Sequence, residues 1–267
     1  MEQFRIAMAQ SGPILFDKQA NLEKAEEYIH EAAAEQVALI IFPELFLTGY
    51  SLGDQAKSLA ETPDGPSARF LAELAYRHRI AIIVGYAELD LSGEHVYDSA
   101  LIIDQHGHVS DSYRKMHLFQ SENGIFQPGN TPCILDLGFG KMGVLICYDL
   151  EFPEAARELA MRGADWIAVS TGNMTPNQHL QEIYLQSRAA ENRIWVCLAN
   201  RVGTEPDLEF FGSSGVADPF GNLAARAGGS ETLLVVDLDL TLAEKAHLNA
   251  DYLTDRRSDL YKNWTSK

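Results

Sequence analysis

Short runs of apolar and β-branched residues recur along the whole chain, and helical patterns separate several of them. Strands are expected at residues 4–9, 38–42, 80–86, 141–146, 166–170 and 195–200. Helices are expected at residues 21–36, at 67–78, from Pro153 onward and at 180–192. This alternation constrains the chain to sheets that are covered by helices.

Two pairs of runs have the pattern of hairpins. Residues 97–104 and 108–113 flank a turn at 105–107, and residues 133–137 and 141–146 flank a turn at 138–140. A later region, with runs at 216–218 and 232–237 around a turn at 218–222, completes the β content. Helix-linked and hairpin-linked strands together predict an α/β fold with mixed sheets. Because no Gly/Ser/Pro-rich linker or internal repeat divides the chain, a single domain is predicted over residues 1–267.

Charge and composition exclude several classes of partner. The net charge of −17 argues against binding to nucleic acid or to an anionic membrane, since phosphate binding needs a cationic surface. No stretch of about 18 apolar residues predicts a membrane span. The N-terminus enters strand-like sequence at once and lacks a signal-peptide pattern, so a cytoplasmic location is expected.

Motifs for cofactors are missing from the sequence. The three cysteines, Cys133, Cys147 and Cys197, are too widely spaced for a disulfide framework or a zinc knuckle. The histidines form no His-Glu-x-x-His pattern, and there is neither a phosphate-binding loop nor a dinucleotide fingerprint. We therefore expect no metal and no organic cofactor.

Glu44, Lys115 and Cys147 have similar positions along the chain, because each follows a strand-like run. Glu44 comes after the apolar residues 38–42, Lys115 follows residues 108–113, and Cys147 comes directly after residues 143–146. Ends of neighbouring strands meet at one edge of a sheet, where α/β folds usually gather their chemistry. If these strands are neighbours, the three functional groups converge.

These three residue types can perform acyl transfer together. A thiol serves as nucleophile, a carboxylate in a partly dry cleft serves as its base, and an ammonium holds the charge of a tetrahedral intermediate. Taken singly, each has an ordinary alternative. Cys147 would be a buried structural cysteine, Glu44 a solvated or capping residue, and Lys115 a surface charge.

The surrounding motifs resemble the nitrilase (carbon–nitrogen hydrolase) superfamily. The resemblance rests on Pro43-Glu44, on Lys115-Met116-His117-Leu118-Phe119 and on Cys147-Tyr148-Asp149 with residues 151–154. It continues through residues 173–176, 188–192, 200–203 and 218–221, and so covers nearly the whole chain. Three separated motifs in the same order are far more specific than any one of them.

This resemblance implies a four-layer α-β-β-α sandwich that pairs into homodimers or larger assemblies. It implies Glu44 as general base, Lys115 as stabiliser of the transition state and Cys147 as nucleophile. A further glutamate of the family, which helps to position substrate, corresponds to Glu122. The family's C-terminal tail commonly crosses to a partner subunit, and residues 250–267 are the corresponding segment here.

The tripeptide Cys147-Tyr148-Asp149 resembles the amidase and carbamoylase branches more than the true nitrilases. Residues 174–176 and 46–50 resemble aliphatic amidases of the 5-aminopentanamidase and stereoselective types. This implies hydrolysis of a small aliphatic carboxamide through a cysteine thioester. An N-carbamoyl amine or amino-acid hydrolase, a nitrilase and a catalytically silent scaffold remain alternatives. One departure from those amidases is Gly172, where alanine is expected; we expect it to alter the pocket loop and to leave the chemistry unchanged.

Other residues are assigned around this centre. The backbone N–H of Tyr148 is expected to contact the oxyanion. His117 and Asp149 are expected to hold local structure, and Cys133 and Cys197 to be core residues. The candidate pocket walls are Tyr50, Met174, Phe46 and Phe211.

Overall fold

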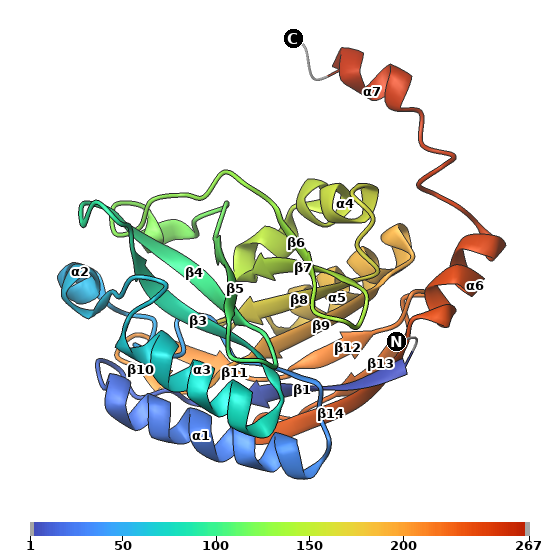
Figure 1. Ribbon diagram of the computed structural model, residues 1–267. Coiled ribbons are helices and arrows are strands. Elements are labelled where there is room, and N and C mark those ends of the chain that lie inside the picture. Colours follow the sequence, from blue (N-terminus) through green and yellow to red (C-terminus); the bar gives the residue numbers. More distant parts are fainter. Residues whose placement is uncertain (1–2, 265–267) are drawn as a thin grey trace.

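The computed structural model describes residues 3–264, and most of its strands form two six-stranded sheets (Figure 1). The first sheet has the order β14 (Thr232–Asp239), β1 (Gln3–Gln10), β2 (Leu39–Ile41), β3 (Ala81–Leu89), β4 (Val96–Ile103) and β5 (Val109–Arg114). The second has the order β13 (Leu223–Arg226), β12 (Gly215–Ala217), β9 (Trp195–Asn200), β8 (Trp166–Thr171), β7 (Lys141–Ile146) and β6 (Cys133–Asp136).

Both sheets have a parallel centre and antiparallel edges. Strands β1, β2 and β3 are parallel to one another, as are β7, β8 and β9. The hairpins β4–β5 and β6–β7 are antiparallel, as the sequence predicted. Parallel neighbours need crossover connections, and helices supply them. The carboxyl ends of β2, β7 and β8 therefore lead directly into loops that can carry functional groups.

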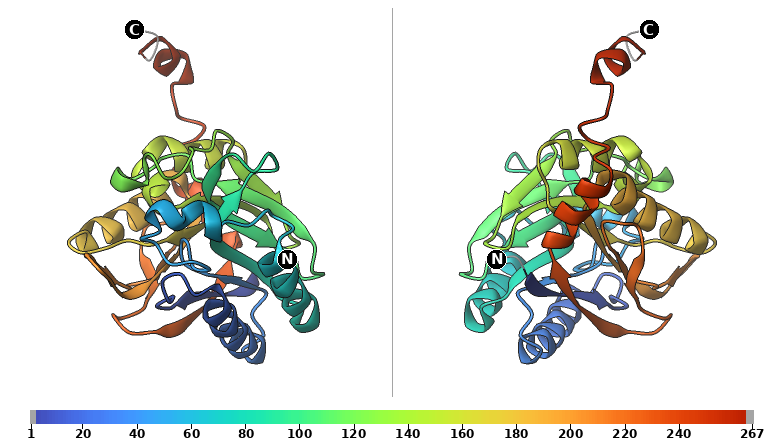
Figure 2. Two further views of the ribbon diagram at one scale, coloured as in Figure 1. Left: turned by 90° about the vertical axis from the view of Figure 1, so that its left-hand side faces the viewer. Right: turned by 90° about the vertical axis from the view of Figure 1, so that its right-hand side faces the viewer.

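Helices cover the outer face of each sheet. Figure 2 shows α1 (Lys18–Ala34) and α3 (Pro66–His78) on one outer side and α5 (Gln178–Asn192) on the other. Helix α4 (Pro153–Met161) packs with α5 against the second sheet. Pro66 and Pro153 each stand at the first helical turn, where the missing N–H costs nothing.

Three apolar cores hold the layers together, one between the two sheets and one between each sheet and its helices. Successive strand residues point to opposite faces, so each sheet contributes to two of these cores. Ile6, Met8, Val144 and Trp166 belong to the core between the two sheets. The alternate residues of the first sheet pack against α1 and α3, and those of the second sheet against α4 and α5. The predicted four-layer α-β-β-α sandwich is therefore confirmed.

Some element boundaries differ from the sequence prediction. Helix α1 begins at Lys18 rather than at residue 21, because the carboxylate of Asp17 accepts a hydrogen bond from the Ala20 N–H (3.0 Å) and caps the helix. The sequence did not predict three short strands, β10 (Val202–Glu205), β11 (Leu208–Phe211) and β13. Each has only four residues, too few to show a period. The short helices η1 (Gly53–Gln55) and α2 (Ala56–Leu59) were also missed.

The last helix of the C-terminal segment leaves the body of the molecule. Helix α6 (Thr241–Asn249), which was not predicted, follows β14, and α7 (Ser258–Trp264) projects away from the two sheets (Figure 1). Residues 265–267 of the predicted tail lie outside the described residues, as do residues 1–2. Within residues 3–264, no helix is both long and apolar enough to cross a membrane. The single domain predicted over residues 1–267 stays a prediction.

Candidate active site

Glu44 lies where the carboxyl ends of β2 and β8 approach each other. The first sheet holds its segment through the Phe42 N–H, which donates to the Ile83 carbonyl (2.8 Å). The second sheet holds it through the Ser170 hydroxyl, which donates to the Phe42 carbonyl (2.7 Å). The carboxylate of Glu44 is fully buried and accepts a hydrogen bond from the Gly172 N–H (2.7 Å).

Lys115 follows β5 and continues its pairing with β4. Its N–H donates to the Asp98 carbonyl (2.8 Å), and its own carbonyl accepts from the Gly129 N–H (2.7 Å). The side chain is completely buried. Both backbone bonds fix the direction in which the ammonium points.

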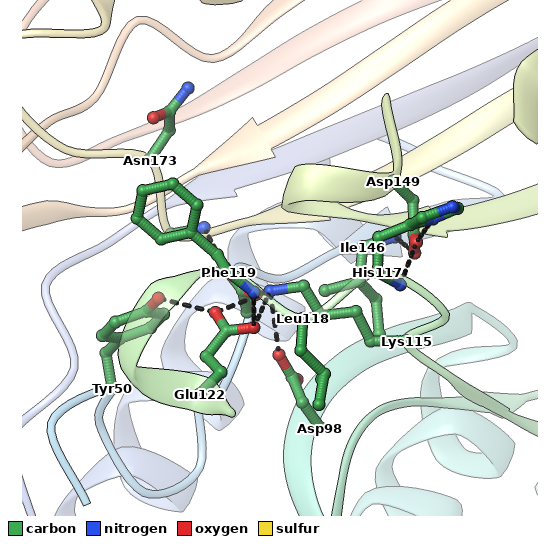
Figure 3. Close-up of polar contacts among 12 residues, drawn as sticks. Tyr50, Asp98, Lys115, His117, Leu118, Phe119, Glu122, Ile146, Asp149 and Asn173 are labelled. Carbon is green, nitrogen blue, oxygen red and sulfur yellow. Dashed lines mark hydrogen bonds and ion pairs between the residues drawn. The ribbon is translucent and has the colours of Figure 1, made fainter. Parts of the chain in front are cut away.

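Asp149 ties the ends of β5 and β7 together. Its carboxylate accepts hydrogen bonds from the N–H of Ile146 (3.1 Å), the hydroxyl of Tyr113 (2.8 Å) and the N–H of His117 (2.9 Å). The His117 ring lies 2.7 Å from the same carboxylate (Figure 3). This geometry agrees with the structural roles predicted for His117 and Asp149, because both hold the segments that present Lys115 and Cys147.

Cys147 begins the short 3-10 helix η3 (Cys147–Glu151) directly after β7. Its φ of 41° lies in the left-handed region, which a residue with a β-carbon occupies at a cost of about 1–3 kcal/mol. The residue is half-buried, unlike the fully buried Cys197 and the buried Cys133 in the core strands. The sharp turn thus brings one thiol of the three to the edge of the sheet.

The ammonium of Lys115 lies among three carboxyl groups. Its Nζ is 2.5 Å from Glu44 Oε1, 2.7 Å from both oxygens of Glu122 and 3.5 Å from Asp98 Oδ2. Figure 3 shows the Lys115 side chain reaching toward Glu122 and Asp98. Among the described residues, these three carboxyls are the group with metal-ligand spacing, their oxygens lying within 4.8 Å of one another. The Lys115 ammonium occupies the position that a metal cation would need.

Glu122 ends the short 3-10 helix η2 (Gln120–Glu122). Besides Lys115, its carboxylate accepts from the Tyr50 hydroxyl (2.6 Å) and from the Phe119 N–H (2.8 Å). Figure 3 shows Tyr50 and Lys115 approaching this carboxylate from opposite sides. The structure therefore brings Glu122 to Lys115 and Glu44, as the resemblance implied.

The loop that carries Tyr50 is held by a buried ion pair that the sequence did not reveal. Arg201 Nη1 lies 2.6 Å from Glu205 Oε1, and both side chains are buried. Glu205 in turn accepts from the N–H groups of Tyr50 (3.0 Å) and Ser51 (2.7 Å). Arg201, between β9 and β10, and Glu205, at the end of β10, thus hold the loop that places the Tyr50 hydroxyl against Glu122.

Of the four candidate pocket walls, Tyr50 and Met174 lie together near the site, and their role as pocket walls stays a prediction. Tyr50 and Met174 belong to one apolar cluster with Phe210, whose ring centroid is 5.8 Å from that of Tyr50. The prediction for Phe46 is wrong, because its side chain belongs to the outer core under α1 and α3. Phe210 replaces Phe211 in this cluster, since alternate strand residues point to opposite faces and the sequence gave no register for β11.

Tyr148 is half-buried beside Cys147. Its ring packs edge-on against Phe119 (5.2 Å between centroids) and Phe152 (4.9 Å). As the second residue of η3, it carries one of the N–H groups that a helix start leaves without an intrahelical partner. That N–H is a donor beside the thiol.

The sequence profile described as carbon–nitrogen hydrolase matches residues 5–247. The chain belongs to the carbon–nitrogen hydrolase family. As a member of the nitrilase superfamily, it is a hydrolase that acts on C–N bonds.

Individual relatives of this carbon–nitrogen hydrolase cover almost all of it. An (R)-stereoselective amidase of a Pseudomonas species is 35% identical over 90% of this chain and 87% of its own length. A nitrilase of Pyrococcus abyssi is 36% identical over 96% of this chain and 98% of its own. Among solved structures, an amidase of Nesterenkonia sp. AN1 matches with a TM-score of 0.88 and 33% identity, covering 98% of this chain and 97% of the other.

Gly172 contacts the candidate base itself. A β-carbon at this position would lie 2.9 Å from Glu44 Oε2 and 3.4 Å from Tyr50 Cδ2. The absence of a side chain at Gly172 therefore leaves space beside Glu44 and Tyr50 in the hydrolase. The departure from alanine lies closer to the chemistry than the sequence suggested.

The electrostatics of the hydrolase keep the Cys147 thiol protonated at rest. Burial raises the pKa of the Cys147 thiol, and the negative charge of Glu44 raises it further. Lys115 and a hydrogen bond with Thr171 oppose these effects. The three carboxyls in turn raise the pKa of Lys115 against the effect of its burial, so the ammonium stays charged.

Replacing Gly85 by alanine is expected to displace Glu44. A β-carbon on this β3 residue would lie 2.7 Å from the carbonyl carbon of Glu44 and would also meet the backbones of Pro43 and Leu45. Since backbone cannot yield cheaply, we expect about 1–3 kcal/mol of destabilisation and a kcat lowered by about 100-fold. Thermal unfolding and steady-state kinetics measure both effects. Gly228→Ala, where nothing lies within 4 Å of the added carbon, is the control, and equal activity of both variants would contradict the assignment.

The Cys147 thiol is expected to titrate above its ordinary pKa of about 8.5. The thiolate absorbance of the wild type minus that of Cys147→Ala, followed against pH, reports this group alone. We expect no thiolate signal at neutral pH. Glu44→Gln removes a negative charge beside the thiol and should shift the titration to lower pH. A thiolate signal from the resting wild type at neutral pH would disprove this description of the site.

Proposed function

We propose that this chain is an amidase that hydrolyses a small aliphatic carboxamide to a carboxylic acid and ammonia. The observation that best supports this function is the buried group of Lys115, Glu44 and Glu122 beside the thiol of Cys147. It supplies a base, a cation and a nucleophile in one dry location. The amidase of Nesterenkonia sp. AN1 gives further support, because a variant carries the acetamide moiety of fluoroacetamide on its active-site cysteine.

In the first half-reaction, Glu44 accepts the proton of the Cys147 thiol while the sulfur bonds to the amide carbon. The carbonyl oxygen becomes an oxyanion, which Lys115 and the N–H of Tyr148 stabilise. Glu44 then gives its proton to the departing nitrogen. The C–N bond breaks, ammonia leaves, and the acyl group remains on sulfur as a thioester.

In the second half-reaction, water takes the place that ammonia has left. Glu44 removes one proton from this water as its oxygen bonds to the thioester carbon. The C–S bond breaks, the acid is released, and the proton on Glu44 returns to sulfur. Glu122 positions the amide and holds Lys115 in place through both of its oxygens.

Burial of the site supports a short acyl chain. Glu44 and Lys115 are completely buried, while Tyr50 and Met174 are each 8% exposed. Tyr50 and Met174 are the proposed walls of the acyl pocket, and they leave little open surface beside the thiol. A cysteine-to-alanine mutant of the Nesterenkonia amidase was solved in complex with butyramide, which is a ligand of this size.

Ammonia release from a panel of short aliphatic amides tests the proposed function. Cys147→Ala is expected to lower kcat by at least about 10⁴-fold, as removal of a catalytic nucleophile does elsewhere. Cys133→Ala removes a buried core thiol and is expected to keep the activity. Appreciable turnover in pure Cys147→Ala protein would disprove the thioester mechanism.

The same panel separates the alternatives. N-carbamoyl compounds that release carbon dioxide together with ammonia would reassign the chain as a carbamoylase. Aliphatic nitriles that turn over in place of amides would reassign it as a nitrilase, which is the name of the Pyrococcus abyssi relative. A Cys147 thiol no more reactive than Cys133 or Cys197, with no turnover at all, would favour a silent scaffold.

We also propose that the chain forms a homodimer or larger homo-oligomer through its C-terminal segment; the cytoplasmic location stays a prediction from the sequence. Helix α7 extends away from the body in both views of Figure 2. Leu248 in α6 is 88% exposed, and Leu260 in α7 is 38% exposed. Exposed apolar side chains such as these are stabilised when a second copy covers them.

Removing residues 258–267 is therefore expected to convert the oligomer into monomers. The covered apolar surface of α7 would be lost, while both sheets and their cores remain. Light scattering coupled to gel filtration measures the mass of each form. The control is Leu91→Ser, which changes a 90% exposed side chain in the β3–β4 turn and should leave the mass unchanged. A full-length chain that runs as a monomer would rule out this assembly.

A further inference from the structure

Three carboxyl groups surround one cation in this site, which leaves two negative charges in excess if all three are ionised. Glu44, Asp98 and Glu122 are each at most 2% exposed, and Lys115 is the ammonium they share. Burying a charge without its own partner is strongly unfavourable, because no water replaces the lost solvation. At least one of the three carboxyls is therefore expected to hold a proton.

Hydrogen-bond donors distinguish the three groups. Glu122 accepts from Lys115, from the Tyr50 hydroxyl and from the Phe119 N–H, so both of its oxygens are satisfied as a carboxylate. Glu44 accepts from Lys115 on one oxygen and from the Gly172 N–H on the other.

Asp98 has no such donors. Both of its oxygens are buried without a hydrogen-bond partner, and Lys115 Nζ lies 3.5 Å away. A carboxylate with unfilled acceptors in a dry site is the least stable of the three ions, whereas a carboxylic acid has an O–H to donate. An oxygen of Glu44 lies within 4.8 Å of an oxygen of Asp98.

We propose that Asp98 is a positioning residue that remains protonated in the resting enzyme and donates its O–H to the carboxylate of Glu44. Resting on the amidase function proposed above, this bond gives Glu44 a third donor. It holds the base ionised and oriented toward Cys147 without adding charge to the site. Lys115 is then shared by two carboxylates, Glu44 and Glu122, and the excess falls from two negative charges to one.

The electrostatics of Asp98 agree with this assignment. Burial raises the pKa of Asp98 well above its ordinary range, and the negative charge of Glu44 raises it further. Lys115 opposes the shift, and Glu122 adds to it. On the neighbouring strand β3, the residue paired with Asp98 is the uncharged Ala87.

Two substitutions of nearly equal size test the role of the proton. Asp98→Asn keeps a donor toward Glu44 and is expected to retain kcat/KM within about threefold of the wild type. Asp98→Leu removes the donor and is expected to lower kcat/KM by about 10- to 100-fold. Thermal unfolding of both variants shows how much of each change comes from stability.

The pH profile of kcat/KM separates positioning from a structural effect, since its acidic limb reports protonation of the coupled carboxyls. Asp98→Leu should move this limb to higher pH, because Glu44 has lost a bond that favours its ionised form. Asp98→Asn should leave the limb in place. If Asp98 were ionised instead, Asp98→Asn would remove a negative charge beside Glu44 and shift the limb to lower pH, which would overturn the proposal.

Infrared spectroscopy of the resting enzyme gives a readout that needs no substrate. We expect the carbonyl band of a buried protonated carboxyl group at neutral pH, and its loss in Asp98→Asn. A wild type without this band, or a band that persists in Asp98→Asn, would overturn the proposal. Because this band is read without turnover, it decides the state of Asp98 even if the amide panel disproves the amidase function.

Discussion

The buried ammonium of Lys115 is the interaction on which the site depends. Glu44 and Glu122 can be ionised inside the protein because this cation lies within 2.7 Å of each. Lys115 in turn can remain charged without water because they surround it. Removing Lys115 would leave both carboxylates as uncompensated buried charges, and removing either carboxylate would take away half of the negative charge that keeps Lys115 protonated. The arrangement is therefore a single electrostatic unit rather than a set of independent residues.

Both sheets are needed to build this unit. Glu44, Lys115 and Asp98 come from the first sheet, whereas Cys147 and Gly172 follow strands of the second. The sheets pack face to face through one apolar core, so their relative position fixes the distance between base and nucleophile. The Ser170 hydroxyl of the second sheet also donates a hydrogen bond to the Phe42 carbonyl beside the first sheet, which joins the two sheets directly.

The longer helices and strands could be predicted from the sequence, and so could the positions of Glu44, Lys115 and Cys147 after the ends of strands. Long apolar runs such as β7 and β9 have a length and composition that predict buried strands. The supporting contacts could not be predicted, because they join distant segments: Arg201 to the Tyr50 loop through Glu205, and Asp149 to Tyr113 and His117. Asp98 stands within a strand, where nothing in the local pattern shows that its side chain faces a cation. The packing of Phe210 likewise depended on a strand register that four residues do not specify.

The complete burial of Lys115 and Glu44 separates the chemistry from the solvent outside. Dissolved ions screen exposed charges over about 8 Å at physiological ionic strength, but they cannot enter between buried groups. The bond-making steps should therefore be insensitive to salt. The surface, with its net charge of −17, responds to salt fully and repels anions when ionic strength is low. Ionic strength thus changes the rate at which charged molecules reach the site and hardly changes the rate of the chemical steps. In dilute buffer, uncharged amides should therefore enter more readily than amides that carry a carboxylate.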